Sequence, residues 1–218
     1  MTRAPLIALI DGPLAADTPG LAARTDICGI HPSAAESPAA LHASHMAAAI
    51  RANAPEAQVL GLSIFPGRLS TSLAIVAEAL RQAAESEAGI VHCSFGHAEA
   101  SPLLAEAVAE VVAAGKLLVA SAPARGAPVF PAGCAGVLSV QGDARCSAGQ
   151  WSLLNLPTVR FGACPGSPGA PVRGASLAAA YFSGLLARAC TGGGVEAMLQ
   201  TPSFTGRERV GAEGPQAA

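Results

Sequence analysis

Short apolar runs alternate with alanine-rich segments along most of this chain, and this alternation restricts its fold more than any other feature. The runs are apolar at successive positions and predict strands buried on both faces, at residues 5–10, 58–64, 90–93, 117–120 and 137–140. The other segments predict helices at residues 41–50, 102–114 and 176–189, and a further helix capped by Ser70 or Thr71. The pattern predicts an α/β fold of three layers, with a parallel sheet flanked by helices.

The remaining segments predict loops and one hairpin. The stretch from Pro13 to about residue 38 is rich in Pro, Ser and Ala and predicts a loop. Residues 151–161 lie between Gly149 and Gly162 and predict a small antiparallel hairpin at the edge of the domain. The tail from about residue 207 is predicted to be loose. The sequence has no clear repeat or linker, so residues 1–218 are predicted to form a single domain.

Charge and cysteine usage exclude several classes of function. The formal net charge is -2 and Lys116 is the single lysine, so the chain lacks the basic face of a nucleic-acid-binding protein. No apolar stretch reaches the roughly 18 residues of a membrane span or has the length of a signal peptide. The six cysteines form no CxxC pair, and we interpret them as reduced thiols that serve as small apolar core residues. The sequence therefore predicts a cytoplasmic protein that binds neither nucleic acid nor membrane.

Three reactive side chains stand at the predicted ends of elements. Asp11 follows the first strand, His42 begins a helix and Ser176 begins the last helix. The carboxyl ends of parallel strands form the ligand-binding edge of such a sheet. If the three meet there, Ser176 attacks a carbonyl carbon, His42 transfers the proton and Asp11 fixes the imidazole tautomer. Taken singly, each has an ordinary explanation, as a turn residue, a packed helix residue and a helix cap.

The segments around these residues resemble the subtilisin-like serine proteases, in the chain order of that family. The resemblance rests on IALIDG around Asp11, HASHMAAAI from His42 and GASLAAAYFSGLLA around Ser176, and it extends from about residue 5 to 190. It implies a subtilisin-like fold and an Asp-His-Ser catalytic triad.

Further motifs of this resemblance concern the substrate. VHCSFG resembles the strand that pairs with bound peptide, which implies that an extended substrate lies beside Ser94, Phe95 and Gly96. LLVASAPARG and VFPAGCAGVLSV resemble the oxyanion segment and the strand beyond it. Ala124 aligns with the family's oxyanion Asn but has no side-chain donor, so a backbone N–H must supply that role. The adjacent Arg125 is expected to point away from this position.

A metal site at His42 is the alternative to a catalytic triad. His42 and His45 share one helix face, and an HxxH pair can supply two metal ligands. In the resembled family the second His is structural, and no acidic loop here has calcium-ligand spacing. We therefore predict no metal and no other cofactor. A third ligand would have to come from elsewhere in the chain, from His31, His92, His97 or Cys93.

The length of the chain also bears on function. It begins at the first strand and leaves no room for the amino-terminal prosegment of secreted members. Small unexported members resemble dedicated peptide-maturation proteases, such as the one that matures the small subunit of quinohemoprotein amine dehydrogenase. This implies a slow, selective serine endopeptidase that removes a leader or linker from a peptide or small-protein partner. The alternative is a pseudoprotease that keeps the fold as a peptide-binding module or chaperone, which Ala124 favours and the retained triad disfavours.

Overall fold

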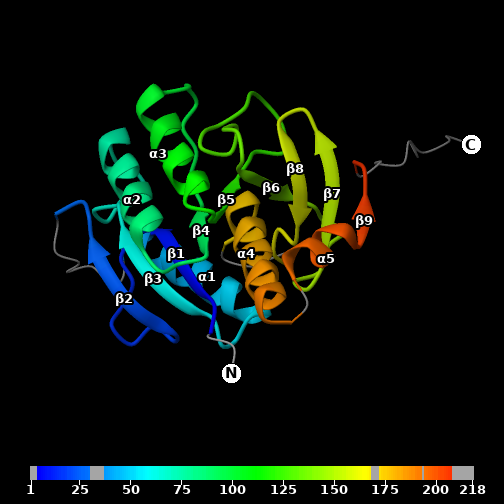
Figure 1. Ribbon diagram of the computed structural model, residues 1–218, viewed down its shortest axis with the longest axis horizontal. Coiled ribbons are helices and arrows are strands. Elements are labelled where there is room, and N and C mark those ends of the chain that lie inside the picture. The colour runs from blue at the N-terminus through cyan, green and yellow to red at the C-terminus, as the bar shows by residue number, and fades with distance from the viewer. Residues whose placement is uncertain (1–3, 30–36, 168–171, 193, 208–218) are drawn as a thin grey trace, which may run out of the picture.

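The computed structural model describes residues 4–29, 37–167, 172–192 and 194–207. Within them one sheet runs in the order β2-β3-β1-β4-β5-β6-β8-β7-β9, with helices on both of its faces (Figure 1). Neighbouring strands from β2 to β8 are parallel, whereas β7 is antiparallel to β8. The predicted three-layer α/β fold with its antiparallel hairpin is therefore confirmed.

The strands are β1 (Leu6–Asp11), β2 (Leu21–Asp26), β3 (Gln58–Ser63), β4 (Ile90–Cys93), β5 (Leu117–Ser121), β6 (Leu138–Gly142), β7 (Trp151–Leu156), β8 (Val159–Ala163) and β9 (Phe204–Thr205). The helices are α1 (Pro38–Asn53), α2 (Leu73–Glu85), α3 (Pro102–Ala113), α4 (Ala175–Gly192) and α5 (Val195–Gln200).

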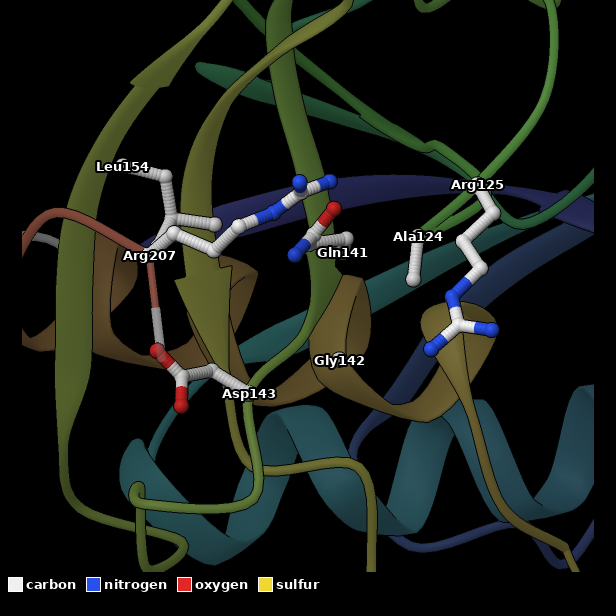
Figure 2. Close-up of a pocket in the computed structure, with 7 residues that line it drawn as sticks. All are labelled: Ala124, Arg125, Gln141, Gly142, Asp143, Leu154 and Arg207. Carbon is white, nitrogen blue, oxygen red and sulfur yellow. The ribbon is translucent and has the colours of Figure 1, made fainter. Parts of the chain in front are cut away.

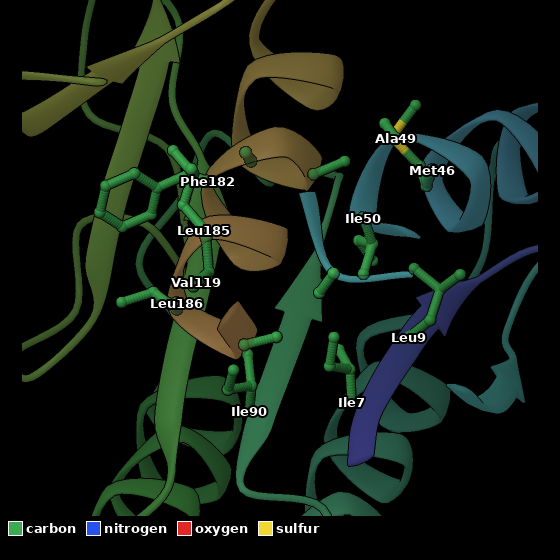
Figure 3. Close-up of a cluster of buried hydrophobic side chains, with 14 of the residues drawn as sticks. Ile7, Leu9, Met46, Ala49, Ile50, Ile90, Val119, Phe182, Leu185 and Leu186 are labelled. Carbon is green, nitrogen blue, oxygen red and sulfur yellow. The ribbon is translucent and has the colours of Figure 1, made fainter. Parts of the chain in front are cut away.

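The core consists of two apolar layers, one on each face of the sheet. Ile7 and Leu9 of β1 pack in the layer formed with α1 and α4, which Figure 3 shows. Ala8 and Ile10 pack in the layer formed with α2 and α3. Successive β1 side chains point to opposite faces, and each face is covered by helices, so every one of these positions is apolar. This explains the unbroken apolar runs in the sequence.

The strand order brings two strand ends together. The chain leaves β1 toward β2 and β3 on one side of the sheet and leaves β4 toward β5 on the other. The topological switch point, where open α/β sheets bind ligands, therefore lies between β1 and β4. Ile10 pairs with Cys93, so Asp11 at the end of β1 lies next to Ser94, which follows β4.

The first turns of two helices carry the other candidate residues. Ser37 caps α1, because its Oγ accepts a hydrogen bond from the Ala40 N–H at 3.2 Å. Pro38 occupies the first turn, which suits its fixed φ, and His42 follows one turn later. Ser176 lies in the first turn of α4. Both side chains thus project from helix starts near the switch point.

Close packing joins these two helices. A Cβ atom at Gly184 of α4 would lie 2.2 Å from the carbonyl oxygen of Ile50 in α1. Asn53 of α1 donates from its side-chain amide to the carbonyl oxygen of Tyr181 at 3.2 Å. The two helices therefore lie in close contact about two turns beyond Ser176 and His42, where no residue larger than glycine fits at position 184 without movement.

Three elements and one cap differ from the sequence predictions. β2 lies in the segment predicted as a loop, and α5 and β9 were not predicted. β2 is an edge strand with mostly exposed side chains, so it lacks the apolar alternation that marks a half-buried strand. Ser72 caps α2 by accepting from the Ile75 N–H at 3.4 Å, so the prediction of Ser70 or Thr71 was wrong. The predicted loose tail falls largely on residues 208–218, outside the described part of the chain.

Five of the cysteines, namely Cys93, Cys134, Cys146, Cys164 and Cys190, are free thiols. Cys93 and Cys146 are buried, as predicted for apolar core residues, but Cys190 is exposed near the end of α4, where that prediction is wrong. The described helices include none with the length and apolarity needed to cross a membrane.

Candidate active site

Asp11 and His42 form a hydrogen-bonded pair at the switch point. Nδ1 of His42 lies 2.9 Å and 2.8 Å from the two carboxylate oxygens of Asp11. The backbone N–H of Gly12 donates to Asp11 Oδ1 at 2.7 Å. The Asp11 side chain is 1% exposed and that of His42 is 13% exposed. Because Nδ1–H donates to the carboxylate, Nε2 of His42 is the nitrogen that can accept a proton.

The environment of the pair makes His42 a stronger base. Burial raises the pKa of Asp11 above its ordinary value, although the hydrogen bond and charge of His42 and the N–H of Gly12 act against this. Burial lowers the pKa of His42, but the hydrogen bond and negative charge of Asp11 outweigh that effect. The pKa of His42 therefore lies above 6.5. His42 has the orientation and the basicity that a general base needs near neutral pH.

Ser176 lies against the residue that follows β4. Its Oγ donates to the carbonyl oxygen of Ser94 at 3.2 Å, and Ser94 Oγ donates to the carbonyl oxygen of Ser176 at 3.4 Å. The hydrogen bonds of the described residues include none between Ser176 and His42. The sequence predicted that Asp11, His42 and Ser176 meet. The structure pairs the first two and directs the hydroxyl of the third to Ser94, from which a rotation about χ1 can release it.

His92 contributes to this site in a way that sequence reasoning missed. It is fully buried in β4, and its Nε2 contacts Ser94 Oγ while its Nδ1 lies 2.9 Å from Ser183 Oγ of α4. The neutral tautomer that satisfies these contacts has Nε2–H donating to Ser94 and Nδ1 accepting from Ser183. Burial, with a contribution from the charge of His42, lowers the pKa of His92 to about 3. A neutral imidazole thus ties β4 to α4 beneath Ser176.

The predicted substrate-binding segment follows β4 outside the regular sheet. Ser94 is buried, Phe95 is half-buried and Gly96 is exposed. The Phe95 ring meets Phe65 edge-on, with 6.1 Å between ring centroids. The segment therefore rests on an aromatic contact on one side and leaves backbone exposed at Gly96.

Ala124 and Arg125 follow β5 and line the same cavity. The expectation that Arg125 points away from Ala124 is wrong, because both residues lie in a bend and not in a strand, where neighbours would alternate. The methyl group of Ala124 offers no hydrogen-bond donor, as predicted from its residue type.

The alternative of a metal site has no support in the described residues. They contain no group of three His, Cys, Asp or Glu side chains that could hold a metal ion. His45 shares the helix with His42, but its Nδ1–H donates to the carbonyl oxygen of Leu41 at 2.6 Å. His31 lies outside the described part of the chain.

Comparisons with known proteins find solved structures of similar fold. No protein-family model and no curated protein sequence matches this chain. A mutant of the protease domain of PatA matches with a TM-score of 0.65 and 21% sequence identity, covering 84% of this chain and 78% of that chain. The prenylagaramide maturation protease PagA matches with a TM-score of 0.61 and 21% identity, covering 84% of this chain and 74% of that chain. At this identity the likeness shows that the chain has the fold of these proteases.

Proposed function

We propose that this chain is a serine endopeptidase of the subtilisin type, with Ser176 as nucleophile, His42 as general base and Asp11 as the residue that orients His42. The observation that carries the proposal is the buried Asp11 carboxylate on Nδ1 of His42, at the switch point where α4 presents a serine in its first turn. A carboxylate buried to this extent needs a partner, and the imidazole then directs its free nitrogen outward. The shared fold with two proteases supports the assignment.

The reaction follows from these positions. Ser176 Oγ forms a bond to the scissile carbonyl carbon as its proton passes to Nε2 of His42, and Asp11 stabilises the resulting imidazolium. The negative charge moves to the carbonyl oxygen, where a free N–H in the first turn of α4 donates. The C–N bond then breaks, and the leaving amine takes the proton from His42. Water repeats the sequence and releases the acyl group from Ser176.

The substrate is proposed to be a leader or linker segment of one partner peptide, removed during its maturation. An extended segment adds beside Ser94, Phe95 and Gly96 by backbone pairing, which gives affinity without strong sequence preference. The name of PagA describes that protein as a maturation protease, and its shared fold supports this role here. The small subunit of quinohemoprotein amine dehydrogenase is one candidate partner. Free thiols such as Cys93 and Cys146 favour a reducing compartment, so we place the activity in the cytoplasm.

A pseudoprotease is the second candidate function. It is favoured by Ala124, which has no oxyanion donor, and by the hydroxyl of Ser176, which bonds to Ser94. Such a protein would hold the peptide beside Ser94 without cutting it.

Labelling with a fluorophosphonate separates the two functions. This probe reacts with a serine only when a neighbouring base activates it. We expect the folded protein to be labelled at Ser176, as located by mass spectrometry, and the Ser176→Ala variant and the heat-unfolded protein to stay unlabelled. A folded protein that resists labelling over hours at neutral pH would exclude the protease and leave the pseudoprotease.

Restoring the missing donor tests the oxyanion position. We expect Ala124→Asn to raise kcat by up to roughly 10²-fold, because removal of the corresponding Asn from subtilisin costs roughly 10²–10³ in kcat. Ala124→Leu is the matched control, since it adds a side chain of similar size without a donor, and it should not raise kcat. An unchanged kcat in the Asn variant would mean that another group already donates to the oxyanion.

A further inference from the structure

A cavity of about 520 Å³ opens beside Ala124, at the carboxyl ends of β5 and β6. Figure 2 shows Arg207 and Arg125 on opposite sides of this cavity, with Gln141 and Ala124 between them. The cavity therefore presents two guanidinium groups beside the position that the resemblance assigns to the oxyanion.

Neither arginine has a charge partner in the described part of the chain. Arg125 and Arg207 are exposed and form no hydrogen bond or ion pair with any described residue. Asp143 also lines the cavity, but its carboxylate is occupied by Arg145 Nη2 at 2.7 Å and by the Ser152 hydroxyl at 2.6 Å. Asp143 and Arg145 neutralise each other, so within the described residues the guanidinium groups of Arg125 and Arg207 give the cavity a net positive charge.

Hydrogen bonds of the preceding residue, Gly206, fix the backbone next to Arg207. The N–H of Gly206 donates to the carbonyl oxygen of Leu153 at 2.9 Å, and the carbonyl oxygen of Gly206 accepts from Arg145 Nη2 at 2.7 Å. These two bonds fix the chain to β7 and to the loop that precedes it, where it reaches the cavity. The position of Arg207 is thus a product of the fold.

Gln141 supplies an independent observation that points to a ligand. Its side chain lines the cavity and the residue is 8% exposed. Its Oε1 is buried and has no hydrogen-bond partner among the described residues. An unpaired buried acceptor costs about 1–3 kcal/mol, and the N–H of a bound peptide would remove that cost.

The cavity adjoins the turn that carries the nucleophile. A Cβ atom built on Gly142, which lines the cavity, would lie 2.9 Å from Pro165 Cβ and 3.8 Å from the carbonyl carbon of Gly174. Gly174 precedes α4 by one residue and Ser176 by two. A peptide held at Ser176 therefore has this cavity within reach of its neighbouring residues.

We propose that this cavity is a specificity site that binds a carboxylate of the peptide substrate close to the scissile bond, through Arg125 and Arg207. The inference rests on the proposed protease function. Guanidinium groups bind carboxylates by charge-assisted hydrogen bonds, and Gln141 receives a backbone N–H of the same peptide. The carboxylate belongs either to an Asp or Glu side chain or to the carboxyl terminus of a short leaving segment.

The test is cleavage of a proteome-derived peptide library by the full chain, with the cut sites read by mass spectrometry. We expect Asp and Glu to be enriched at one position near the cut, or cuts to fall a fixed distance from peptide carboxyl termini. Resynthesised peptides separate the two sources of carboxylate. Glu→Gln replacement, or amidation of the terminus, should lower kcat/KM roughly tenfold for the wild-type protein.

The Arg125→Gln/Arg207→Gln variant should lose this preference while it keeps the wild-type unfolding temperature and is still labelled by a fluorophosphonate at Ser176. Arg160→Gln/Arg188→Gln is the matched control, since both residues are exposed and neither lines the cavity. It should keep the preference. Cleavage with no acidic preference, or a preference that survives in the cavity variant, would overturn the carboxylate site and leave the protease function standing.

A binding measurement covers the case in which no peptide is cut. The immobilised Ser176→Ala protein is exposed to the same library, and retained peptides are counted. Retention of acidic peptides that is lost when Arg125 and Arg207 are also replaced by Gln supports the site even if the wild-type protein proves inactive. Equal retention by both proteins would overturn it.

Discussion

Replacing Asp11 by Asn is expected to lower kcat by about 10⁴-fold while leaving the fold intact. The amide has the size of the carboxylate, but its NH₂ group faces Nδ1 of His42, which must then act as an acceptor. The imidazole proton moves to Nε2, where Ser176 needs a base. The second-order rate of fluorophosphonate labelling measures this without knowledge of the natural substrate, and cleavage of any peptide that the unmodified protein cuts gives kcat.

The exposed Asp17 offers a matched control for this change. Asp17→Asn removes the same charge outside the site and should leave the labelling rate unchanged. A loss of less than about tenfold in the Asp11 variant, with its unfolding temperature preserved, would mean that the carboxylate does not orient His42.

Replacing His92 by Leu is expected to destabilise the fold by about 2 kcal/mol at pH 7.5 and by close to nothing at pH 5. At pH 7.5 the variant leaves the buried hydroxyls of Ser94 and Ser183 without their imidazole partner, which costs about 1–3 kcal/mol. Below pH 6.5 the unfolded chain protonates His92, whereas the folded protein resists this until about pH 3. The stabilisation from His92 is therefore complete above pH 6.5 and falls by about 1.4 kcal/mol per pH unit below it.

Urea unfolding of the wild type and the His92→Leu variant at pH 7.5 and pH 5 measures this change in stability. All other titrating groups are common to the two proteins, so their contributions cancel. The His92→Leu/Ser183→Ala double variant should regain part of the stability lost at pH 7.5, since it removes one orphaned hydroxyl. If the free energies of unfolding of wild type and the His92 variant differ equally at both pH values, His92 is not held neutral by the fold.

The elements with strong apolar patterns were predictable from the sequence, and the weakly patterned ones were not. β1, β3, β4 and β5 are apolar on both faces, and their runs mark them almost to the residue. β2 depends on its parallel pairing with β3 at the sheet edge, and its exposed side chains carry no signal of that contact. The cap of α2 at Ser72 was misplaced because Ser70, Thr71 and Ser72 are all acceptable caps and only the backbone selects one.

At the candidate site, the residues involved were predictable from the sequence, whereas the orientations of their side chains were not. The sequence marks Asp11 and His42 as polar residues at element ends, and the structure joins them. The sequence does not indicate that Ser176 Oγ donates to the Ser94 carbonyl oxygen, because the direction of this hydroxyl depends on a side-chain rotation. The one available signal for the buried network was His92 within the apolar run IVHC, since a buried imidazole requires partners.

The contact between Gly184 of α4 and Ile50 of α1 affects the distance between Ser176 and His42 at the starts of the same helices. Ser176 lies eight residues from Gly184 and His42 lies eight residues from Ile50, which is about 12 Å along each helix. A change of about 5° in the crossing angle at the contact would shift the far ends by about 1 Å relative to each other. A displacement of that size between a nucleophile and its base can cost about 10² in rate. A side chain at position 184 would therefore alter the distance between Ser176 and His42 from about 12 Å away along α4.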